Sequence, residues 1–387
     1  MPFGCRPRDL AHVAARVVDD GVASAAAVGA AHREGVWRYG DGVAGTLWPT
    51  SVAAGAPRAS LETVFDLASL TKPITALAFA RLERRGVITR EESLGAVLGQ
   101  RLPSILVTAS SDVPLDLLMA HRAGLVAHNP FYEGLLRGER PNLSEVLFAA
   151  ANMRREGCVG SPPADGFAPI YSDLGYILVG AAMEARTGEP LDALMAREVV
   201  SALDLVPEDA LGSARQLRAA GIADDKFAPT EVVDWRGGLV RGVVHDENAW
   251  LVAGDGAAGH AGAFGTVGAV VALGRLLLDA LAGRSAWLSP SELAPLIRPR
   301  PGGSLAAGFD RRSEEPGVTP ASGAHFSGST IGHLGFTGTS LWIDPVAEFA
   351  AVLLTNRVCP TREHIAIRRA RPIAYDAMVH AMTMPVA

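Results

Sequence analysis

Lysine is nearly absent from this sequence of 387 residues. Only Lys72 and Lys226 are lysines among the 35 basic residues, and the remaining 33 are arginines. Arginine keeps its proton in proteins, whereas a lysine amine can give up its proton and act as a base. A base of the lysine type is therefore available at two positions, and the residues around each position indicate whether it is used.

Cysteine is also scarce. Cys5, Cys158 and Cys359 are odd in number and lack the spacing of a disulfide framework or a metal site, which is typical of a reducing compartment. The first residues contain no apolar stretch of the signal-peptide kind, and no run reaches the roughly 18 apolar residues of a membrane span. We therefore expect a cytoplasmic protein without a membrane partner.

Positive charge is not concentrated anywhere that would suit a nucleic acid. The formal net charge is −6, and no basic stripe runs along the chain. The arginines between Arg362 and Arg371 are typical of a solvated helix face. These observations exclude nucleic acid as a partner, and nothing in the sequence indicates the oligomeric state.

One of the two lysines follows a serine by three residues, in Ser69-Leu70-Thr71-Lys72. Apolar residues at helical spacing follow, and Gly86 supplies a stop, so we expect a helix that begins at Ser69. That spacing puts Ser69 and Lys72 on one face, and the helix dipole lowers the pKa of an amine there. A serine hydroxyl needs such a base to become a nucleophile. The alternative is a surface lysine beside a helix-capping serine.

Hydrophobic patterns along the chain predict an α/β (α+β) fold. Hairpins are expected at both ends of the chain, and helices in the middle and at the termini. The predicted strand pairs are 25–31 with 36–39 and 339–343 with 348–354, and the predicted helices are 8–20, 114–122, 143–153, 173–187, 190–203, 267–282 and 361–383. Residues 299–330 read as a long loop. We expect an antiparallel sheet flanked by helices (1–89 plus 241–387), a helical domain (90–240), and the active site between them.

Two further motifs follow the serine and lysine in order. Tyr171-Ser172-Asp173 opens another helix, and His333-Leu334-Gly335-Phe336-Thr337-Gly338-Thr339 leads into a strand. With Ser69-x-x-Lys72, these resemble S-x-x-K, Y-S-N and K-T-G or H-x-G of the serine β-lactamase and penicillin-binding-protein superfamily, in its class C and DD-peptidase/esterase branch. Residues 118–125 and 259–266 resemble that branch's L-L-T-H-T-S-G-L helix end and its glycine-rich loop. The resemblance covers nearly the whole chain and implies a β-lactamase/transpeptidase-like fold.

The middle motif fits two readings, and each misses by one residue. In a class A reading, S-D-N would make Ser172 the proton shuttle and put Leu174 where Asn belongs. In a class C reading, Tyr171 is the shuttle and Asp173 stands where Asn belongs. Gly175 and Tyr176, together with the histidine of the third motif, favour the class C reading.

On that reading, the resemblance implies a role for each motif residue. Ser69 attacks an acyl carbon, and Lys72 and Tyr171 share the general-base work. The backbone N–H groups of Ser69 and Phe336, beside Gly335, form the oxyanion hole. His333 helps to hold the hydrogen-bond network of Tyr171. A buried aromatic side chain with a satisfied hydroxyl is the plainer interpretation of Tyr171.

Two departures from the family pattern bear on the substrate. The family Asn donates its amide N–H to the acyl side of the substrate, and the ionised Asp173 has no donor to offer. Histidine at position 333 brings a less reliable positive charge than lysine for a substrate carboxylate. Both departures lower the β-lactamase and transpeptidase readings and favour an esterase or amidase. Asp173 could instead be turned away as a helix N-cap.

Other motifs are weaker. The G-x-G-x-x-G pattern of 254–259 would suit a dinucleotide, but no helix can start directly after it. The polar run 245–248 is more typical of a loop-fixing hydrogen-bond cluster than of a metal site.

His260, flanked by glycines, is a candidate for substrate contact. Phe131, Trp235 and Trp250 either line an acyl pocket or belong to the core, and we expect no metal and no cofactor.

The sequence therefore predicts a serine hydrolase that acts on a small ester or amide through a Ser69 acyl-enzyme. The small-molecule acyl substrate is its expected partner. A D-amino-acid peptidase or weak β-lactamase is the first alternative. A non-catalytic binding module with the same fold is the second, and the presence of Ser69, Lys72 and Tyr171 together argues against it.

Overall fold

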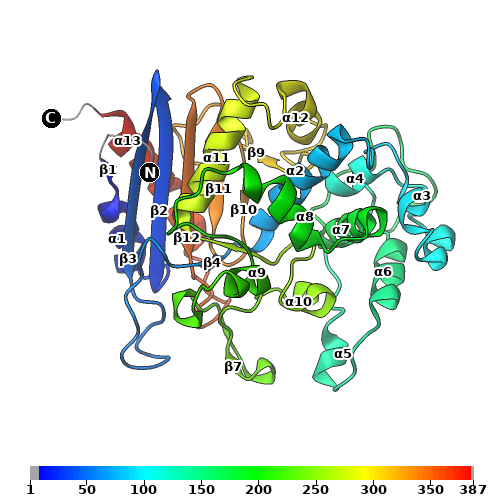
Figure 1. The fold of residues 1–387 in the computed structure, drawn as a ribbon, viewed down its shortest axis with the longest axis horizontal. Coiled ribbons are helices and arrows are strands. Elements are labelled where there is room, and N and C mark those ends of the chain that lie inside the picture. Colours follow the sequence, from blue (N-terminus) through cyan, green and yellow to red (C-terminus); the bar gives the residue numbers. More distant parts are fainter. Residues whose placement is uncertain (1–7, 385–387) are drawn as a thin grey trace.

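A seven-stranded sheet forms one side of the molecule in the computed structural model, which describes residues 8–384 (Figure 1). The strand order is β1-β3-β2-β12-β11-β10-β9, and all neighbours pair antiparallel except β1 and β3. The strands are β1 (Arg8–Asp9), β2 (Ala25–Glu34), β3 (Val36–Gly45), β9 (Asp310–Arg311), β10 (Ile331–Leu334), β11 (Ser340–Asp344) and β12 (Phe349–Thr355). The two ends of the chain thus meet in one sheet, where β2 pairs with β12.

Both faces of this sheet are covered, so its central strands are apolar throughout. Alternate residues of β2, such as Val28 and Ala30, pack with helices α1 (Ala11–Asp19) and α13 (Ile367–Thr383). The other set, including Ala27 and Ala31, faces α11 (Val267–Leu281) and the main core. A strand buried on two sides reads as a continuous apolar run and not as an alternating one. This explains the alanine-rich sequence of β2.

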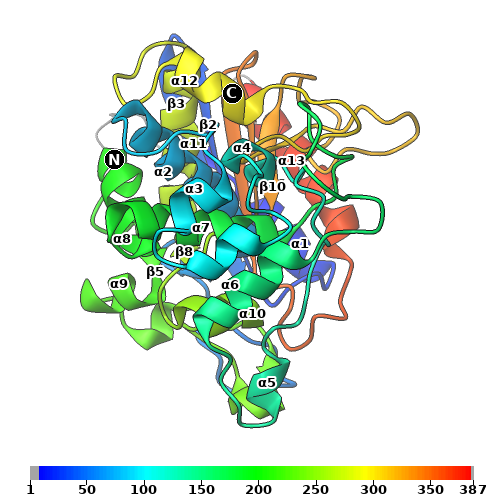
Figure 2. The same ribbon diagram turned by 90° about the vertical axis from the view of Figure 1, so that its right-hand side faces the viewer.

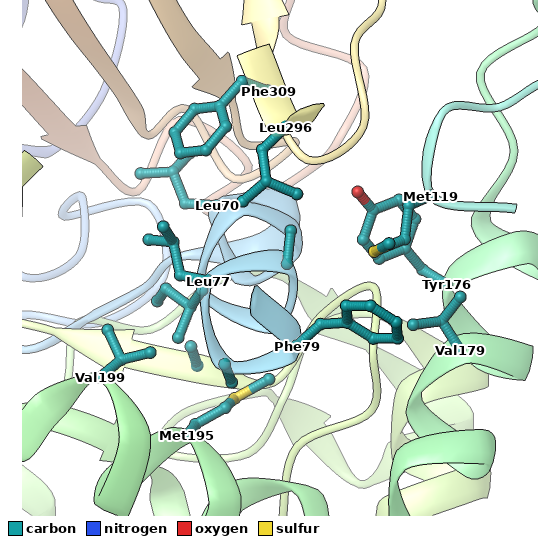
Figure 3. Packing of buried hydrophobic residues seen from close by; sticks show 14 of the residues in the cluster. Leu70, Leu77, Phe79, Met119, Tyr176, Val179, Met195, Val199, Leu296 and Phe309 are labelled. Carbon is teal, nitrogen blue, oxygen red and sulfur yellow. The ribbon is translucent and has the colours of Figure 1, made fainter. Parts of the chain in front are cut away.

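The second half of the molecule is helical (Figure 2). It is built around α2 (Thr71–Arg84), nearly all of which is buried. Phe79 of α2 lies on the side of Tyr176 and Val179 of α7 (Asp173–Thr187), whereas Leu77 points to the other side of the helix (Figure 3). These residues and Met195 belong to one hydrophobic cluster. The surrounding helices are α3 (Leu94–Leu98), α4 (Leu115–Met119), α5 (Glu133–Leu136), α6 (Leu143–Asn152), α7 (Asp173–Thr187), α8 (Leu191–Glu198), α9 (Ala214–Ala219), α10 (Glu247–Ala253) and α12 (Pro290–Ile297). One hydrophobic cluster runs from this region to the sheet.

Short elements connect the two halves. A small sheet has the order β4-β8-β5, formed by β4 (Phe65–Asp66), β8 (Ala263–Gly265) and β5 (Leu211–Ser213). A hairpin is formed by β6 (Val232–Val233) and β7 (Gly238–Leu239). The 3₁₀ turns are η1 (Ala68–Leu70), η2 (Pro103–Val107), η3 (Val200–Ala202), η4 (Asp224–Lys226) and η5 (Asp234–Arg236). The sheet β4-β8-β5 leads directly into η1, which carries Ser69.

The predicted α/β architecture and both predicted hairpins are confirmed, but several boundaries were wrong. The helix predicted for 361–383 starts at Ile367, and the helix predicted for 190–203 breaks into α8 and η3. The predicted helix 114–122 is shorter, and the predicted loop 299–330 contains β9. The sheet β4-β8-β5 was missed because strands of two or three residues leave no periodic pattern. The division at residues 90 and 240 stays a prediction.

Candidate active site

Ser69 lies in the tight turn η1, between strand β4 and helix α2. Ala68 adopts a left-handed conformation with φ of 49°, which is strained for a residue with a side chain. The turn is held from both sides. The Ala68 N–H donates to Asp66 Oδ1 at 2.8 Å, and the Thr71 hydroxyl donates to the Ala68 carbonyl at 2.7 Å. The α-helix therefore starts at Thr71, two residues later than the sequence predicts.

Lys72 is fully buried, and all three donors of its ammonium group are used. Its Nζ atom donates to Ser69 Oγ at 2.9 Å, to Asp173 Oδ1 at 2.7 Å and to the His260 carbonyl at 3.3 Å. Ser69 and Lys72 were predicted to lie on one helix face, and their side chains are in direct contact. A lysine at this position can receive the hydroxyl proton once its amine is neutral.

The charge state of Lys72 differs from the sequence prediction. Burial by itself would lower the pKa of Lys72, but the carboxylate of Asp173 and the Tyr171 phenol raise it above its ordinary value. The prediction from the helix dipole was therefore wrong in sign, because it took no account of Asp173. In the resting site Lys72 is an ammonium group and has no lone pair to accept a proton.

Of the two positions considered from the sequence for Asp173, the structure excludes the helix N-cap. Asp173 is the first residue of α7, the N-cap position belongs to Ser172, and no side-chain capping bond is made. The Asp173 carboxylate is turned instead toward Lys72, and its Oδ2 lies 3.7 Å from Nδ1 of His128. Burial by itself would raise the pKa of Asp173, but Lys72 and His128 hold it well below its usual range. The N-cap interpretation was wrong.

Tyr171 lies beside the reacting pair. Lys72 Nζ lies 4.6 Å from the centroid of the Tyr171 ring, which stacks on His121 with centroids 4.7 Å apart. The Ser172 hydroxyl, in contrast, donates to the Val126 carbonyl at 2.6 Å. This geometry favours the class C reading, with Tyr171 as the shuttle. Burial raises the pKa of Tyr171, although the charge of Lys72 opposes this.

His121 holds Tyr171 from behind. It has φ of 60°, and its Nδ1 accepts the Ser172 N–H at 3.0 Å, so the remaining proton of the neutral ring is on Nε2. Burial and the charge of Lys72 lower the pKa of His121 to about 3. This hydrogen bond lies just beyond the end of α4.

The turn after β10 lies against the segment that carries Ser69. Thr337 donates to the Asp66 carbonyl at 2.7 Å, and Thr339 donates to the Leu67 carbonyl at 2.9 Å. A Cβ atom on Gly335 would lie 2.6 Å from the Leu67 carbonyl, so only glycine fits this contact. Within residues 8–384, the Phe336 N–H has no hydrogen-bond acceptor. It is free for the predicted oxyanion role.

His333 lies close to Tyr171, with ring centroids 5.9 Å apart. Its Nδ1 is 2.9 Å from the Leu334 carbonyl oxygen, so the neutral ring donates there and Nε2 is left as an acceptor. Burial and the charge of Lys72 lower the pKa of His333 to about 3. His333 is therefore uncharged at neutral pH and offers no positive charge to a substrate.

A cavity of about 710 Å³ opens beside Ser69. One part of its wall is acidic and comes from α7 and α10, through Asp173, Asp246 and Glu247. The other part comes from the segment between β12 and α13 and from α13 itself, and it is rich in arginine. The other polar and aromatic residues in the wall are Tyr132, Tyr171, His128, His245, Asp310, His333, Phe336, Arg357, Arg362, Arg368 and Arg371.

Comparison with known proteins assigns the family. The model of the family described as Beta-lactamase matches residues 10–375. The chain belongs to this beta-lactamase family. It is therefore a serine hydrolase by family, and the predicted β-lactamase/transpeptidase-like fold is confirmed.

Relatives of this beta-lactamase-family chain have several activities in their names. An N-acetylmuramyl-L-alanine amidase of Bacillus subtilis is 29% identical over 316 residues, 76% of this chain and 68% of the relative. A putative D-alanyl-D-alanine carboxypeptidase of Salmonella typhimurium is 27% identical over 318 residues, covering 78% and 71%.

Solved structures share the fold at lower identity. EstCE1, described as a hydrolase with promiscuous acyltransferase activity, aligns with a TM-score of 0.64 at 20% identity, covering 93% of this chain and 97% of that one. A class C beta lactamase of Rhodobacter sphaeroides aligns with a TM-score of 0.63 at 16% identity, covering 96% and 99%.

His260 takes a different place in this beta-lactamase-family chain from the one predicted. Its buried ring does not line the cavity, and its Nε2 lies 2.9 Å from Asp246 Oδ1. Its backbone carbonyl is the part that reaches the site, through Lys72. The adjacent Gly259 is explained by packing, because a Cβ there would lie 1.9 Å from the Tyr176 carbonyl. No helix follows the G-x-G-x-x-G loop directly, since β8 intervenes before α11.

The polar run 245–248 fixes loops, as predicted. His245 pairs with Glu231 at 2.9 Å, Asp246 caps α10, and Glu247 pairs with Arg362. Asn248 donates to the Asn129 carbonyl at 2.8 Å. Within residues 8–384 there is no group of three or more side chains placed to hold a metal ion, and no helix is long and apolar enough to cross a membrane.

Several site residues were missed by the sequence analysis, above all His128 and the arginines of the cavity wall. His128 follows the 118–125 segment in an irregular loop, where no spacing connects it to Asp173. Of the predicted aromatic candidates, Phe131, Trp235 and Trp250 do not line the cavity, although Trp235 stacks on Tyr132, which does. Cys158 and Cys359 are buried free thiols, and Cys5 lies outside the described residues.

Proposed function

We propose that this serine hydrolase cleaves a small ester or amide through an acyl-enzyme on Ser69. The observation that carries the proposal is the 2.9 Å contact of Lys72 Nζ with Ser69 Oγ beside a cavity of about 710 Å³. Proximity of this kind removes much of the entropic barrier to proton transfer and attack. The active site would also be fully formed before substrate binds.

The steps follow from the positions of the side chains. Lys72, once neutral, accepts the Ser69 proton as Oγ bonds to the acyl carbon, and the N–H groups of Ser69 and Phe336 stabilise the oxyanion. Tyr171 then protonates the leaving group as its bond to carbon breaks. In the second half, Tyr171 takes a proton from water as water attacks the acyl-enzyme. The bond between the acyl carbon and Ser69 Oγ then breaks, and Lys72 returns its proton to Oγ.

The charges of the cavity support a neutral acyl group. Asp173, Asp246 and Glu247 lie on the same part of the wall, and an anionic acyl group would be repelled there. Neutral His333 supplies no compensating charge. A small neutral ester or amide avoids both costs, whereas a penicillin carries a carboxylate.

A fluorophosphonate probe tests the nucleophile directly. We expect wild type to be labelled and Ser69→Ala to be unlabelled, with a melting temperature close to wild type because Lys72 keeps Asp173 as its partner. A panel of p-nitrophenyl esters, D-aminoacyl anilides and nitrocefin then defines the substrate. Labelling that survives in Ser69→Ala places the nucleophile elsewhere, and nitrocefin turnover typical of a dedicated β-lactamase contradicts the substrate assignment.

One observation favours a D-amino-acid peptidase as the second candidate. Arg368 lines the cavity and is exposed, and within residues 8–384 its guanidinium has no hydrogen-bond or ion-pair partner. A free guanidinium suits the carboxylate of a peptide C-terminus. We expect Arg368→Gln to lower kcat/KM about tenfold for a D-alanyl peptide and not for a neutral ester. An equal change for both substrates removes this candidate.

A further inference from the structure

His128 is a second cationic partner of Asp173. Its Nδ1 lies 3.7 Å from Asp173 Oδ2, while Lys72 Nζ lies 2.7 Å from the other carboxylate oxygen. The two ends of this trio differ in exposure, because the Lys72 side chain is 0% exposed and the His128 side chain is 46% exposed. The carboxylate thus connects a buried amine to a histidine in the cavity wall.

The trio of Lys72, Asp173 and His128 affects the protonation state of Lys72. Lys72 must be neutral to accept the Ser69 proton, yet its carboxylate partner favours the ammonium form. When both cations are protonated, the trio of Lys72, Asp173 and His128 carries two positive charges and one negative. Loss of one proton leaves a single cation beside a single carboxylate. That remaining proton can lie on Lys72 or on His128, and the total charge is the same in both cases.

We propose that His128 becomes the counterion of Asp173 when Lys72 gives up its proton, and that this exchange makes Lys72 a base near neutral pH. The inference rests on the Ser69 acyl-enzyme of the proposed function. Neutral Lys72 accepts the proton of Ser69 Oγ as the Oγ–carbon bond forms, and His128 stays an imidazolium beside Asp173. His128 acts through Asp173 and is a positioning residue, because this role requires no contact with the reacting atoms.

The groups around His128 favour the imidazolium. Asp173 faces it from α7, and Asp246 and Glu247 act on it from α10. The interaction with Asp173 raises the pKa of His128 above its ordinary value, against the effect of burial. These carboxylates therefore keep a proton on His128 within reach of neutral pH.

The other groups around Lys72 can be compared with His128 as possible counterions of Asp173. Lys72 contacts Asp173, Tyr171, Ser69 and the His260 carbonyl. His121 and His333 also act on it, but burial lowers the pKa of each to about 3, so both are neutral. The charge of His260 also acts on Asp173, but the His260 ring is paired with Asp246. His128 is the histidine whose ring lies within ion-pair distance of the Asp173 carboxylate.

The pH dependence of acylation tests the proposal. With wild type, we expect kcat/KM for p-nitrophenyl butyrate to rise with pH through a limb at or above the ordinary histidine pKa of about 6.5. In His128→Gln the rising limb shifts to higher pH by at least about two units, because the raised pKa of Lys72 alone then controls the profile. The rate at pH 7 then falls about 100-fold, since each pH unit on the limb is tenfold.

Three further variants make the test specific. His12→Gln, on the exposed face of α1, is the matched control and leaves the profile unchanged. In an Asp173→Asn background Lys72 has lost its counterion, so adding His128→Gln leaves the limb where it is. His128→Asn repeats the single change with a smaller side chain, and circular dichroism confirms that each variant is folded.

The outcomes separate this inference from the proposed function. A limb that stays in place in both His128→Gln and His128→Asn overturns the inference. A uniform loss of rate at every pH also overturns it, because that result indicates only a contact or packing role. If wild-type Ser69 is not labelled by the fluorophosphonate, the proposed function itself fails, whatever the pH profile.

Discussion

Lys72 Nζ and Asp173 Oδ1 lie 2.7 Å apart, and they join two elements that are 101 residues apart in the chain. The lysine is fully buried, so its charge is tolerable only with this partner. Removing one member of a buried pair typically costs about 3–5 kcal/mol, because the other charge is left uncompensated. The same pair sets the proton affinity of Lys72. Stability and base strength are therefore coupled at this contact.

Lys72→Arg is expected to be as inactive as Lys72→Ala. Arginine keeps the positive charge for Asp173 but cannot release a proton at neutral pH. We expect both variants to lose at least about 100-fold in the rate of acylation, measured as the burst with a p-nitrophenyl ester. If Lys72→Arg kept most of the activity, Lys72 would act only through its positive charge, and Tyr171 would be the base.

The second lysine supplies the control. Lys226 lies in η4, its side chain is 44% exposed, and it pairs with Glu62 at 2.5 Å. It does not line the catalytic cavity. Lys226→Arg is therefore expected to leave acylation unchanged.

Asp173→Asn is expected to shift selectivity and to lower stability. An amide removes the repulsion of an anionic acyl group, so acylation by a β-lactam rises relative to a neutral ester by roughly 5- to 150-fold. The change also leaves Lys72 without its counterion, so the melting temperature falls. Both rate constants and thermal denaturation are measured in wild type and variant. An unchanged ratio would mean that the Asp173 carboxylate does not meet the substrate.

Glu231 is expected to stabilise the fold in mild acid. Burial by itself would raise its pKa, but His245 and Arg362 lower it from 4.5 to about 2. Stability from a carboxyl group with a lowered pKa is complete above the unfolded value and is lost as the pH falls through the folded one. The difference of about 2.5 pKa units corresponds to about 3 kcal/mol, lost between about pH 4.5 and pH 2.

Urea denaturation between pH 2 and pH 7 measures this dependence. We expect Glu231→Gln to be less stable than wild type at pH 7 and to show a flatter decline on acidification. Glu363→Gln is the control, because Glu363 is exposed. If the decline of Glu231→Gln runs parallel to that of wild type, Glu231 does not contribute to acid stability.

Local sequence patterns predicted much of this structure, but they did not predict its long-range contacts. The spacing of Ser69 and Lys72 predicted their contact, because side chains three residues apart are neighbours in a helical turn. The order of the three motifs predicted the fold and which residues meet at Ser69. Asp173 was identified as unusual, but its pairing with Lys72 depends on how α7 packs near α2. For that reason the predicted pKa of Lys72 had the wrong sign.

His128 and the arginine wall were outside the reach of pattern analysis. His128 stands in Ala127-His128-Asn129-Pro130, where no periodicity or spacing indicates a partner. Arg362 was assigned to a helix face, but it lies before α13 and bonds to Glu231 and Glu247. Both placements arise from loop conformation, which sequence periodicity does not encode. A histidine soon after the helix end at residues 118–125 was the available signal.

The scarcity of lysine has a practical consequence for chemical modification. Lys72 is sealed inside the folded protein, so Lys226 is the one lysine side chain that reagents in solution can reach. An amine-directed dye or resin would attach at that position, apart from any reaction at the α-amino group. Because Lys226 does not line the cavity, the molecule could be tethered to a surface in one orientation through a residue outside the catalytic opening.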